Sequence, residues 1–298
     1  MSYSTFSKPP TGRFAPSPTG DLHLGSLVAA TASYLNVKQR QGNWLVRIDD
    51  IDTPRVVPGS QETICRQLES YGFEWDKLIN QSQRLSYYQD ALSDLTQLGL
   101  VYRCDCTRKQ IQQRLHQSGL YDNFCRHRQL VSQANQSVRV VTPETPWRWH
   151  DTIQGTQSFD WQSQSGDFIV KRADGIWAYH LVAAVDDSDE SITEVIRGAD
   201  LLSATAPQQY LQQCLKRPIP IYAHHPLMRD AQSQVKLSKA THAPAITAFD
   251  AVKNLWQVLS FLNQHPPSDL QTATLHEVWQ WAIENWSLEK INPSTERD

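Results

Sequence analysis

The fold of this chain is decided by residues 13–26, which read Arg-Phe-Ala-Pro-Ser-Pro-Thr-Gly-Asp-Leu-His-Leu-Gly-Ser. A short extended piece at 12–15 runs into two prolines, Pro16 and Pro18, which favour a turn. Apolar residues then recur from 24 to 35 at the spacing of one helix face. The stretch therefore predicts a strand, a rigid turn and a helix that starts near His23.

This arrangement suits a ligand that carries phosphate. The first N–H groups of a helix have no partner within the helix, and they carry the positive end of its dipole. We expect His23 to donate a hydrogen bond to a phosphoryl oxygen there, with the hydroxyls of Ser17 and Thr19 nearby. Gly25 lacks a Cβ, which lets a nucleotide approach the backbone. A bare His-Leu-Gly is usually an ordinary turn, so the prediction depends on the whole string.

The next segments continue the same pattern. Residues 44–48 are a compact run with β-formers, and the acidic run 49–52 closes it. A helix is expected from Ser60, as its N-cap, to a stop at Gly72. The order strand, helix, strand, helix predicts an α/β fold with a parallel sheet.

The middle of the chain breaks this pattern. From 104 to 174 the periodicity weakens and Gln, Ser, Arg and Trp dominate, which predicts an insertion within the α/β domain. Regular character resumes over 176–185, an element that Asp186 and Asp187 are expected to end. The last part of the chain shows two amphipathic helical segments.

Composition limits the classes of function. The chain has 28 Lys and Arg against 31 Asp and Glu, a formal net charge of −3, which argues against holding nucleic acid by bulk charge but allows a local basic face. No stretch approaches the roughly 20 apolar residues of a membrane helix, and residues 1–10 show no signal-peptide core. Five cysteines, three of them crowded together, predict a cytoplasmic protein with a metal site rather than disulfides.

The crowded cysteines are Cys104, Cys106 and Cys125. Three thiolates bind Zn²⁺ well, and a tetrahedral site needs one more ligand. Ligand chemistry alone favours a histidine over a phenol, and three reduced thiols without metal remain the plainer alternative. A zinc ion here would be structural, because the insertion has little core of its own. The nearby candidates for the fourth ligand are Tyr121, His116 and His127.

Four segments together resemble the class I glutamyl- and glutaminyl-tRNA synthetases. Residues 13–26 resemble the HIGH region of that family, and residues 45–52 (LVRIDDID) resemble the strand that follows it. Residues 195–202 (VIRGADLL) resemble its amino-acid pocket segment, and residues 235–239 (VKLSK) its second ATP motif, the KMSKS loop. Four motifs in the family's order are far more specific than any one of them.

The resemblance covers most of the chain and implies an α/β class I synthetase fold with a Rossmann-like nucleotide-binding domain. It also implies a zinc-bearing, acceptor-type insertion, a short helical C-terminal part and no anticodon-binding domain. The expected boundaries are 11–103 with 175–240 for the catalytic domain, 104–174 for the insertion and 241–298 for the helical region.

The resemblance further implies roles for individual residues, with Mg²⁺ accompanying ATP. The expected catalytic residues are His23, Lys236 and Lys239. The expected ATP contacts are Ser17, Thr19, His23, Gly25, Ser238 and Lys239. The expected L-glutamate contacts are Arg13, Phe14, Ala15, Pro16, Ser17, Asp49, Tyr179 and Arg197. Two residues depart from the family pattern: Ala240 stands where Ser is common, and Asp49 where Glu is common.

Physical chemistry supports these roles without deciding them. Two lysines on a mobile loop can neutralise charge that grows at an α-phosphate. Glutamate needs a cation for its side-chain carboxylate, for which Arg13 and Arg197 are candidates, and an anion such as Asp49 for its ammonium. Structural roles are equally open from the residues alone, with Asp49 as a strand cap, Tyr179 in the core and Arg197 paired with Asp200.

The length of the tail favours one subgroup of the family. Only 59 residues follow Lys239, room for two or three helices but not for an anticodon-binding domain. A short glutamyl-synthetase-like subgroup has a Tyr-x-x-x-Cys-Arg zinc pattern that residues 121–126 resemble. The resemblance implies Tyr121 as the fourth zinc ligand, with His127 and His116 as alternatives.

In that subgroup glutamate is activated with ATP and passed from glutamyl-adenylate to the queuosine base of tRNA(Asp), so ATP, L-glutamate and queuosine-bearing tRNA(Asp) are the expected partners. A truncated glutamyl-tRNA synthetase that charges a tRNA 3′ end is the main alternative. A non-catalytic RNA-binding relative is another, although it would have no need of His23, Lys236 and Lys239.

Overall fold

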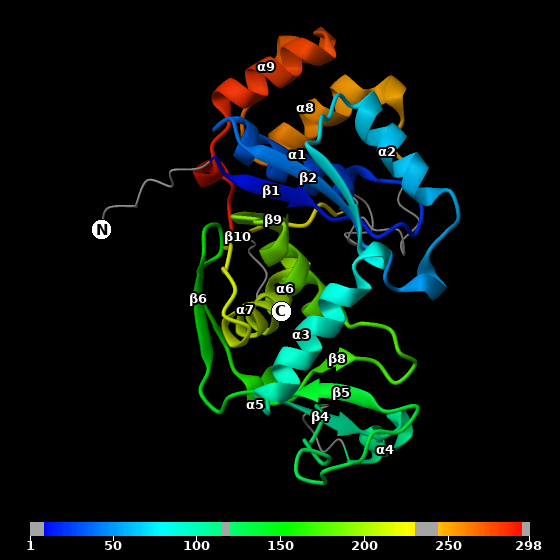
Figure 1. The fold of residues 1–298 in the computed structure, drawn as a ribbon. Coiled ribbons are helices and arrows are strands. Elements are labelled where there is room, and N and C mark those ends of the chain that lie inside the picture. Colours follow the sequence, from blue (N-terminus) through cyan, green and yellow to red (C-terminus); the bar gives the residue numbers. More distant parts are fainter. Residues whose placement is uncertain (1–8, 115–119, 230–243, 294–298) are drawn as a thin grey trace.

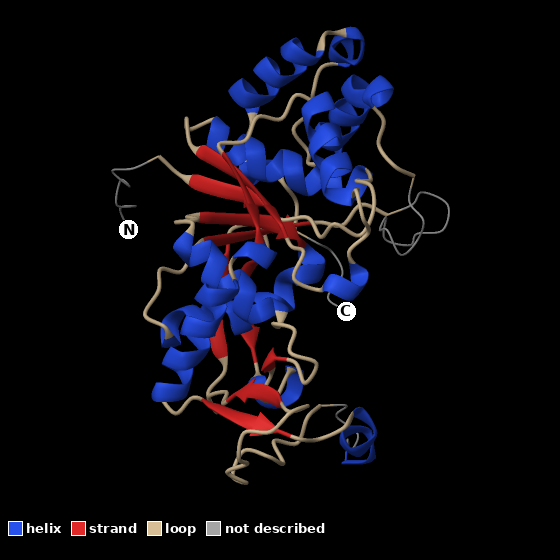
Figure 2. Ribbon diagram, turned by 45° about the vertical axis from the view of Figure 1, so that its right-hand side comes forward, coloured by secondary structure: helices blue, strands red, loops and turns tan. Residues whose placement is uncertain are grey.

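The computed structural model describes residues 9–114, 120–229 and 244–293, and these form two β-sheets with helices around them (Figures 1 and 2). The larger sheet has the strand order β3-β2-β1-β9-β10-β6-β7, and only its edge pair β6 and β7 is antiparallel. Its strands are β1 (Thr11–Phe14), β2 (Asn43–Ile48), β3 (Lys77–Asn80), β6 (Trp147–Asp151), β7 (Gly155–Phe159), β9 (Glu194–Gly198) and β10 (Ile221–His225). The smaller sheet is antiparallel and consists of β4 (Val101–Cys104), β5 (Ser137–Val140) and β8 (Ile169–Lys171).

Helices lie on both faces of the larger sheet (Figure 2). The first helix, α1, packs against β1 and carries α8 and α9 on its outer side, whereas α6 and α7 pack together on the opposite face (Figure 1). The helices are α1 (Leu24–Lys38), α2 (Ser60–Ser70), α3 (Leu85–Gln97), α4 (Arg108–Arg114), α5 (Trp161–Gln164), α6 (Tyr179–Asp189), α7 (Thr205–Cys214), α8 (Ala251–Phe261) and α9 (Leu275–Asn285).

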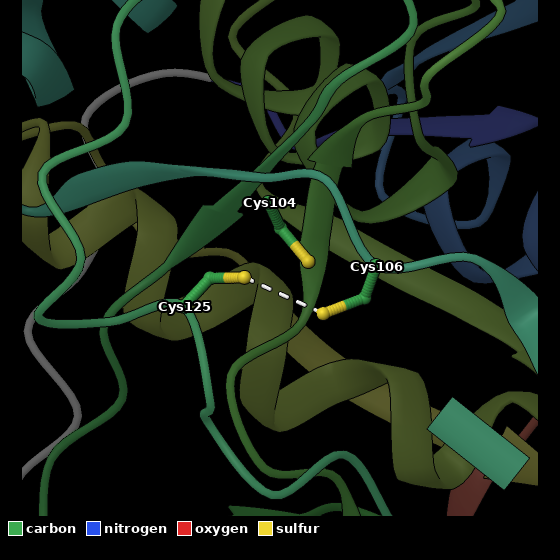
Figure 3. Close-up of side chains that lie close together, drawn as sticks. All are labelled: Cys104, Cys106 and Cys125. Atoms are coloured by element: carbon green, nitrogen blue, oxygen red, sulfur yellow. Dashed lines mark hydrogen bonds between the residues drawn. The ribbon is translucent and has the colours of Figure 1, made fainter. Parts of the chain in front are cut away.

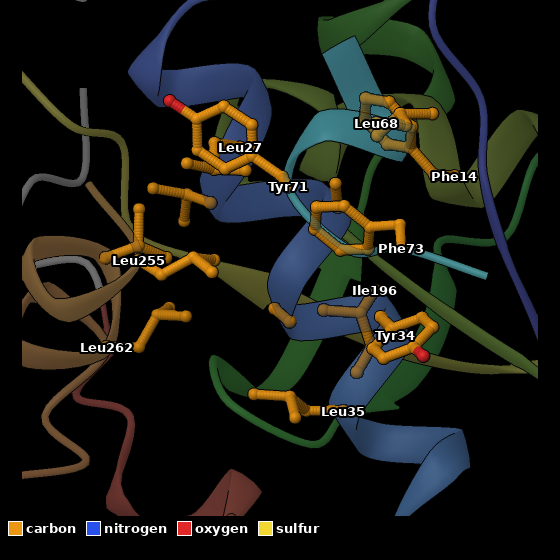
Figure 4. Close-up of a cluster of buried hydrophobic side chains, with 14 of the residues drawn as sticks. Phe14, Leu27, Tyr34, Leu35, Leu68, Tyr71, Phe73, Ile196, Leu255 and Leu262 are labelled. Atoms are coloured by element: carbon orange, nitrogen blue, oxygen red, sulfur yellow. The ribbon is translucent and has the colours of Figure 1, made fainter. Parts of the chain in front are cut away.

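The largest hydrophobic cluster joins α1 and the first strands to the C-terminal helices (Figure 4). Trp44 of β2 is fully buried, with the Tyr34 ring edge-on at 5.1 Å and the Phe73 ring stacked at 5.4 Å between centroids. Aromatic contacts of this kind add stability beyond the area they bury. Leu255 and Leu262 close the cluster from the side of α8. The turn after β1, which the sequence predicts to bind phosphate, is therefore supported by a well-packed core.

The strand order reverses between β1 and β9. The chain builds outward from β1 through β2 to β3 on one side, and from β9 to β10 on the other. In open α/β sheets, ligands bind at such a reversal, beyond the carboxyl ends of the strands. Arg13 lies at this end of β1, Asp49 directly follows β2, and Arg197 lies near the end of β9. The fold therefore brings residues from three of the four predicted glutamate segments to one edge of the sheet.

The predicted α/β class with a parallel sheet is confirmed, but two local predictions are wrong. Helix α2 begins at Ser60, so Ser60 is not its N-cap; its hydroxyl instead accepts from the Gly20 N–H at 2.9 Å and donates to the Gly20 carbonyl at 3.0 Å. Asp186 and Asp187 do not end an element, because α6 continues to Asp189 with both carboxylates buried. Facing arginines, described below, make that burial possible.

Residues 104–174 are divided between the two sheets instead of forming one separate unit. Strands β5 and β8 join β4 in the smaller sheet, which lies with α4 at the lower end of Figure 1. Residues 147–159, by contrast, form β6 and β7 and extend the larger sheet beyond β10. The boundary drawn from composition therefore does not follow the strand pairing. Among the described residues, no helix combines the length and the apolar character that crossing a membrane requires.

Candidate active site and metal centre

A cavity of about 340 Å³ opens at the carboxyl ends of the parallel strands. Its walls come from the turn after β1, the segment after β2 and the residues that lead into α6. These are three of the places where the sequence predicts ligand contacts. The predicted contacts that line the cavity are Ser17, Thr19, Asp49 and Tyr179.

The turn after β1 is held in place by the start of α1. His23 is the N-cap of this helix, and its Nδ1 accepts a hydrogen bond from the Ser26 N–H at 3.2 Å. Because Nδ1 accepts, a neutral His23 carries its proton on Nε2. The Pro16 carbonyl accepts from the Asp49 N–H at 3.0 Å, which ties this turn to the segment after β2. The turn can therefore offer an imidazole N–H donor from a fixed position.

A network of buried charges lies behind this turn. The Arg13 guanidinium donates to Asp187 through Nε at 3.0 Å and Nη2 at 3.3 Å. Arg47 donates through Nη1 to Asp187 at 2.6 Å and through Nε to Asp49 at 2.7 Å. Phe14 packs in the core, with its ring stacked at 6.4 Å from Trp44. Of the two candidate cations for glutamate, Arg13 is therefore already paired with a buried carboxylate, that of Asp187, which it shares with Arg47.

The two acids of this network have opposite pKa shifts. Burial raises the pKa of Asp49 to about 6, even though Arg47 opposes the shift. Burial acts in the same direction on Asp187, but Arg13 and Arg47 outweigh it and hold the pKa of that carboxyl below its ordinary value. Asp187 is therefore ionised at neutral pH, whereas Asp49, on the cavity wall, changes its charge near pH 6.

Arg197, the second candidate cation, has no carboxylate among its partners in the described part of the chain. Its side chain is buried and makes five hydrogen bonds, all to uncharged groups, so the predicted alternative of a pair with Asp200 is not among them. The longest, at 3.3 Å, reaches the hydroxyl of Tyr179 on the cavity wall. A buried cation without a counter-ion attracts an anion strongly. The partners are His224, Tyr179, Gln208, Thr205 and the Leu201 carbonyl.

The predicted second ATP motif, with Lys236, Ser238 and Lys239, lies outside the described residues. Its return to the described chain is clear, however. Ala245 forms a β-bridge with His23, and the Ile246 N–H donates to the Leu22 carbonyl at 2.9 Å. The described residues that follow the second motif in the chain, Ala245 and Ile246, therefore lie beside the first motif.

The three predicted metal-binding cysteines lie together near the smaller sheet, and their sulfur atoms point toward one another (Figure 3). The sulfurs of Cys104, Cys106 and Cys125 all lie within 4.8 Å of one another, and those of Cys106 and Cys125 are 3.4 Å apart. Burial raises the pKa of Cys104, but the hydrogen bond with Tyr121 and further contacts outweigh it and bring the value to about 7. The cluster is compatible with a zinc site.

Tyr121 is the side chain that completes this cluster geometrically. Its hydroxyl lies 3.4 Å from the Cys104 sulfur and accepts from the Cys125 N–H at 2.9 Å. The Arg139 guanidinium lies 3.6 Å from the centroid of its ring, a cation–π contact that holds the ring in place. His127 is exposed and takes no part in the cluster, and His116 lies outside the described residues.

Several residues near the site were not found from the sequence. The sequence predicts Asp186 and Asp187 only as the end of an element, and it predicts no role for Asp151 or His224. The signal in the sequence is the position of Asp186 and Asp187 within an apolar helical run, because charged residues buried in such a run have to be paired. Arg84, which donates to Asp186 at 2.6 Å, belongs to the same group.

The chain matches a family model described as tRNA synthetases class I (E and Q), catalytic domain, over residues 11–259. Curated relatives align over nearly the whole chain. A glutamyl-Q tRNA(Asp) synthetase of Pectobacterium atrosepticum is 46% identical, over 93% of this chain and 85% of that protein. Proteins of the same name from Chromobacterium violaceum and Thiobacillus denitrificans are 43% and 46% identical, with 94% of each chain covered.

Solved structures show the same fold. A glutamate-tRNA synthetase of Elizabethkingia anophelis superposes with a TM-score of 0.81 at 23% identity, over 97% of this chain and 68% of that one. A glutamate tRNA ligase of Elizabethkingia meningosepticum, solved in complex with its amino acid, gives the same TM-score and identity, with 67% of that chain covered. At this identity the likeness establishes the class I synthetase fold, as predicted, and nothing finer.

Proposed function

The chain belongs to the class I tRNA synthetases of the E and Q type and, within them, to the glutamyl-Q tRNA(Asp) synthetases, and from this we propose that it activates L-glutamate with ATP and transfers it to the queuosine base of tRNA(Asp). The observation that carries this function is identity of 41–46% with relatives of that name over about 94% of the chain. The protein is a ligase, and its reaction needs no covalent enzyme intermediate.

The reaction has two steps. The α-carboxylate of glutamate attacks the α-phosphorus of ATP, the bond to pyrophosphate breaks, and glutamyl-adenylate forms. A hydroxyl of the queuosine base then attacks the activated carbonyl carbon and AMP leaves. Mg²⁺ bound with ATP would neutralise phosphate charge. The chain's own residues contribute positioning and electrostatic stabilisation.

We assign the parts of the cavity on this basis. His23, with its proton on Nε2, donates to the ATP phosphates, and Lys236 and Lys239 neutralise them from the second motif. Arg197 receives the side-chain carboxylate of glutamate, because its buried charge has no carboxylate partner in the described chain. Asp49 receives the ammonium group. Arg13 acts indirectly: it shares Asp187 with Arg47, and Arg47 in turn holds Asp49.

The assignment of Asp49 predicts a pH dependence. Only the ionised carboxylate attracts an ammonium group, and the pKa of Asp49 is raised to about 6. The KM for glutamate should therefore rise as pH falls below about 6, by up to about tenfold per pH unit. The fold binds this proton more tightly than the unfolded chain does, so the contribution of protonated Asp49 to stability is complete below about pH 4 and is lost as the pH rises through about 6.

The measurement is the glutamate KM in ATP–pyrophosphate exchange from about pH 5 to pH 8, for the wild type and Asp49→Asn. The variant should have a higher KM that no longer changes through pH 6. If both proteins show the same pH profile, Asp49 does not bind the ammonium group.

We further propose that the cysteine cluster holds one structural Zn²⁺ with Tyr121 as the fourth ligand. Three converging thiols and a hydroxyl at 3.4 Å from one of them fit a closed four-ligand site. Zinc would pin the loop around Cys125 to the end of β4 at Cys104.

Removing the Tyr121 hydroxyl should weaken zinc binding. Tyr121→Phe keeps the ring under Arg139 but loses a ligand atom, so competition with a chelator should show zinc affinity lowered by at least about tenfold. The matched control is His127→Ala, which should retain wild-type affinity. Unchanged zinc in Tyr121→Phe combined with loss in His127→Ala would reverse the ligand assignment.

The function is tested by its acceptor. Labelled glutamate and ATP are supplied with tRNA(Asp) that carries or lacks queuosine, and label is expected only on the modified tRNA. Label on both tRNAs, removable from the 3′ end, would favour a truncated glutamyl-tRNA synthetase. Glutamate-dependent exchange in the absence of tRNA tests the first step separately, and equal exchange with aspartate or glutamine would overturn the substrate. ATP, glutamate and tRNA meet in the cytoplasm, where we place the reaction.

A further inference from the structure

Arg197 is held from behind by two residues that no predicted motif includes. Its Nε donates to His224 Nε2 at 2.9 Å, across the neighbouring strands β9 and β10, where the two residues are paired in register. His224 Nδ1 lies 2.5 Å from Asp151 Oδ2, at the end of β6. Asp151 and His224 are fully buried, and Arg197 almost so.

The hydrogen-bond directions decide the state of the imidazole. An arginine Nε–H can only donate, so His224 Nε2 has to accept, and a neutral ring then carries its proton on Nδ1. That proton is donated to Asp151. The other carboxylate oxygen of Asp151 accepts from the N–H groups of His224, Ile153 and Gln154 at 3.1, 3.1 and 2.9 Å. The carboxylate is thus anchored to the backbone. Each hydrogen bond in the series has one direction: Arg197 Nε donates to His224 Nε2, and His224 Nδ1 donates to Asp151.

Arg197 does not itself line the cavity, and its other four N–H groups donate to Tyr179, Gln208, Thr205 and the Leu201 carbonyl. With Nε occupied by His224, Arg197 reaches Tyr179 on the cavity wall through Nη1. The negative charge of Asp151 stays behind the imidazole and does not pair with Arg197 directly. A carboxylate in direct contact would neutralise the cation, whereas a neutral imidazole orients it and leaves its charge available.

We propose that Asp151 and His224 are positioning residues that hold the Arg197 guanidinium for the side-chain carboxylate of the substrate. The inference rests on the proposed function, in which Arg197 receives that carboxylate. It adds a specificity role for two residues that themselves touch no substrate.

Two substitutions at His224 separate its two hydrogen bonds. His224→Asn places an amide near the position of Nδ1 and can keep the bond to Asp151, but it loses the acceptor for Arg197. His224→Gln places a carbonyl oxygen near the position of Nε2 and can keep that acceptor. A bond to a charged group makes the larger contribution, so His224→Asn should raise the glutamate KM roughly 10- to 100-fold. In His224→Gln the KM should recover to within about threefold of the wild type.

Asp151→Asn supplies a second, independent variant. An asparagine amide facing Nδ1 drives the His224 proton to Nε2, where it opposes the Arg197 Nε–H, as a wrong tautomer does in a serine-protease triad. The same rise in glutamate KM is expected, with the KM for ATP and kcat changed by no more than about threefold. A merely structural role would instead affect both substrates or neither.

The experiment is glutamate-dependent ATP–pyrophosphate exchange with full-length protein, with circular dichroism to show that each variant is folded. A wild type without exchange would remove the proposed function itself. With an active wild type, a glutamate KM within twofold in both His224→Asn and Asp151→Asn would overturn the positioning role. So would equal rises in the KM for ATP and for glutamate. If His224→Asn fails to fold, the positioning role is decided by the glutamate KM of Asp151→Asn and of His224→Gln. A glutamate KM in His224→Gln as high as that in Asp151→Asn would also overturn the positioning role.

Discussion

Replacing Asp187 with asparagine should lower the free energy of unfolding by about 3–5 kcal/mol, the usual cost of removing one partner from a buried ion pair. Two arginines, Arg13 and Arg47, donate to this carboxylate, and all three side chains are at most 4% exposed. Arg47 keeps Asp49 in the variant, but Arg13 would face a neutral amide in a nearly dry interior. Denaturant titration at pH 7, with the midpoint and slope both fitted, measures the loss.

The matched control is Asp189→Asn on the same helix. Asp189 also faces two arginines, Arg84 and Arg217, but its side chain is 24% exposed. Its loss should cost no more than about 1 kcal/mol. Equal costs for the two variants would mean that burial does not set the strength of this network.

Asp187 also sets a limit on stability in acid. Its pKa in the fold is held below its ordinary value by Arg13 and Arg47 against the effect of burial. Its contribution is therefore complete above about pH 4, the pKa of an unfolded aspartate, and is lost as pH falls through the lower folded value. In that acidic range the free energy of unfolding of the wild type should fall to that of Asp187→Asn.

At His23, asparagine and glutamine should give opposite outcomes. In His23→Asn the side-chain oxygen can take the place of Nδ1 and accept from the Ser26 N–H, so the cap of α1 survives. The donor at the Nε2 position is lost, and glutamate-dependent exchange should fall by roughly 10²–10³, the usual effect of removing one preorganised donor to developing charge.

His23→Gln is the complementary variant. Its amide can place an N–H donor near the position of Nε2, but it reaches past the capping position. We expect a loss of about 0.5–2 kcal/mol in stability, with exchange well above that of His23→Asn. Normal exchange in His23→Asn would show that His23 serves only as a helix cap. Stability is measured by denaturant titration and exchange at saturating ATP and glutamate.

Local features of the fold followed well from sequence. The strand before Pro16, the helix that starts after His23 and the buried strand around Trp44 are each defined by neighbouring residues, through turn chemistry and apolar spacing. The apolar faces of α8 and α9 are buried as expected, with Leu255 and Trp279 among their core residues. Such patterns survive because a segment's own periodicity sets which face turns inward.

The boundary of the insertion did not follow from sequence. Composition separates 104–174 from the rest, but strand pairing is a relation between distant segments. Strand β6 has a Trp-rich sequence and β7 a mostly polar one, and both resemble the rest of the insertion in composition. They join the larger sheet because β10 offers them a partner, which no local pattern records.

The candidate site shows the same division. The motif order, the phosphate-type turn and the Cys-x-Cys spacing are properties of the chain itself, and they were enough to identify the family and to expect glutamate, ATP and zinc. Only the tertiary structure decided which charges are paired. Arg13 and Arg197 are equivalent candidates in sequence, yet one shares Asp187 and the other has five uncharged partners. The physical reason is that the effect of a charge depends on burial and on its neighbours across the sheet, and both are set by the register that brings His224 beside Arg197.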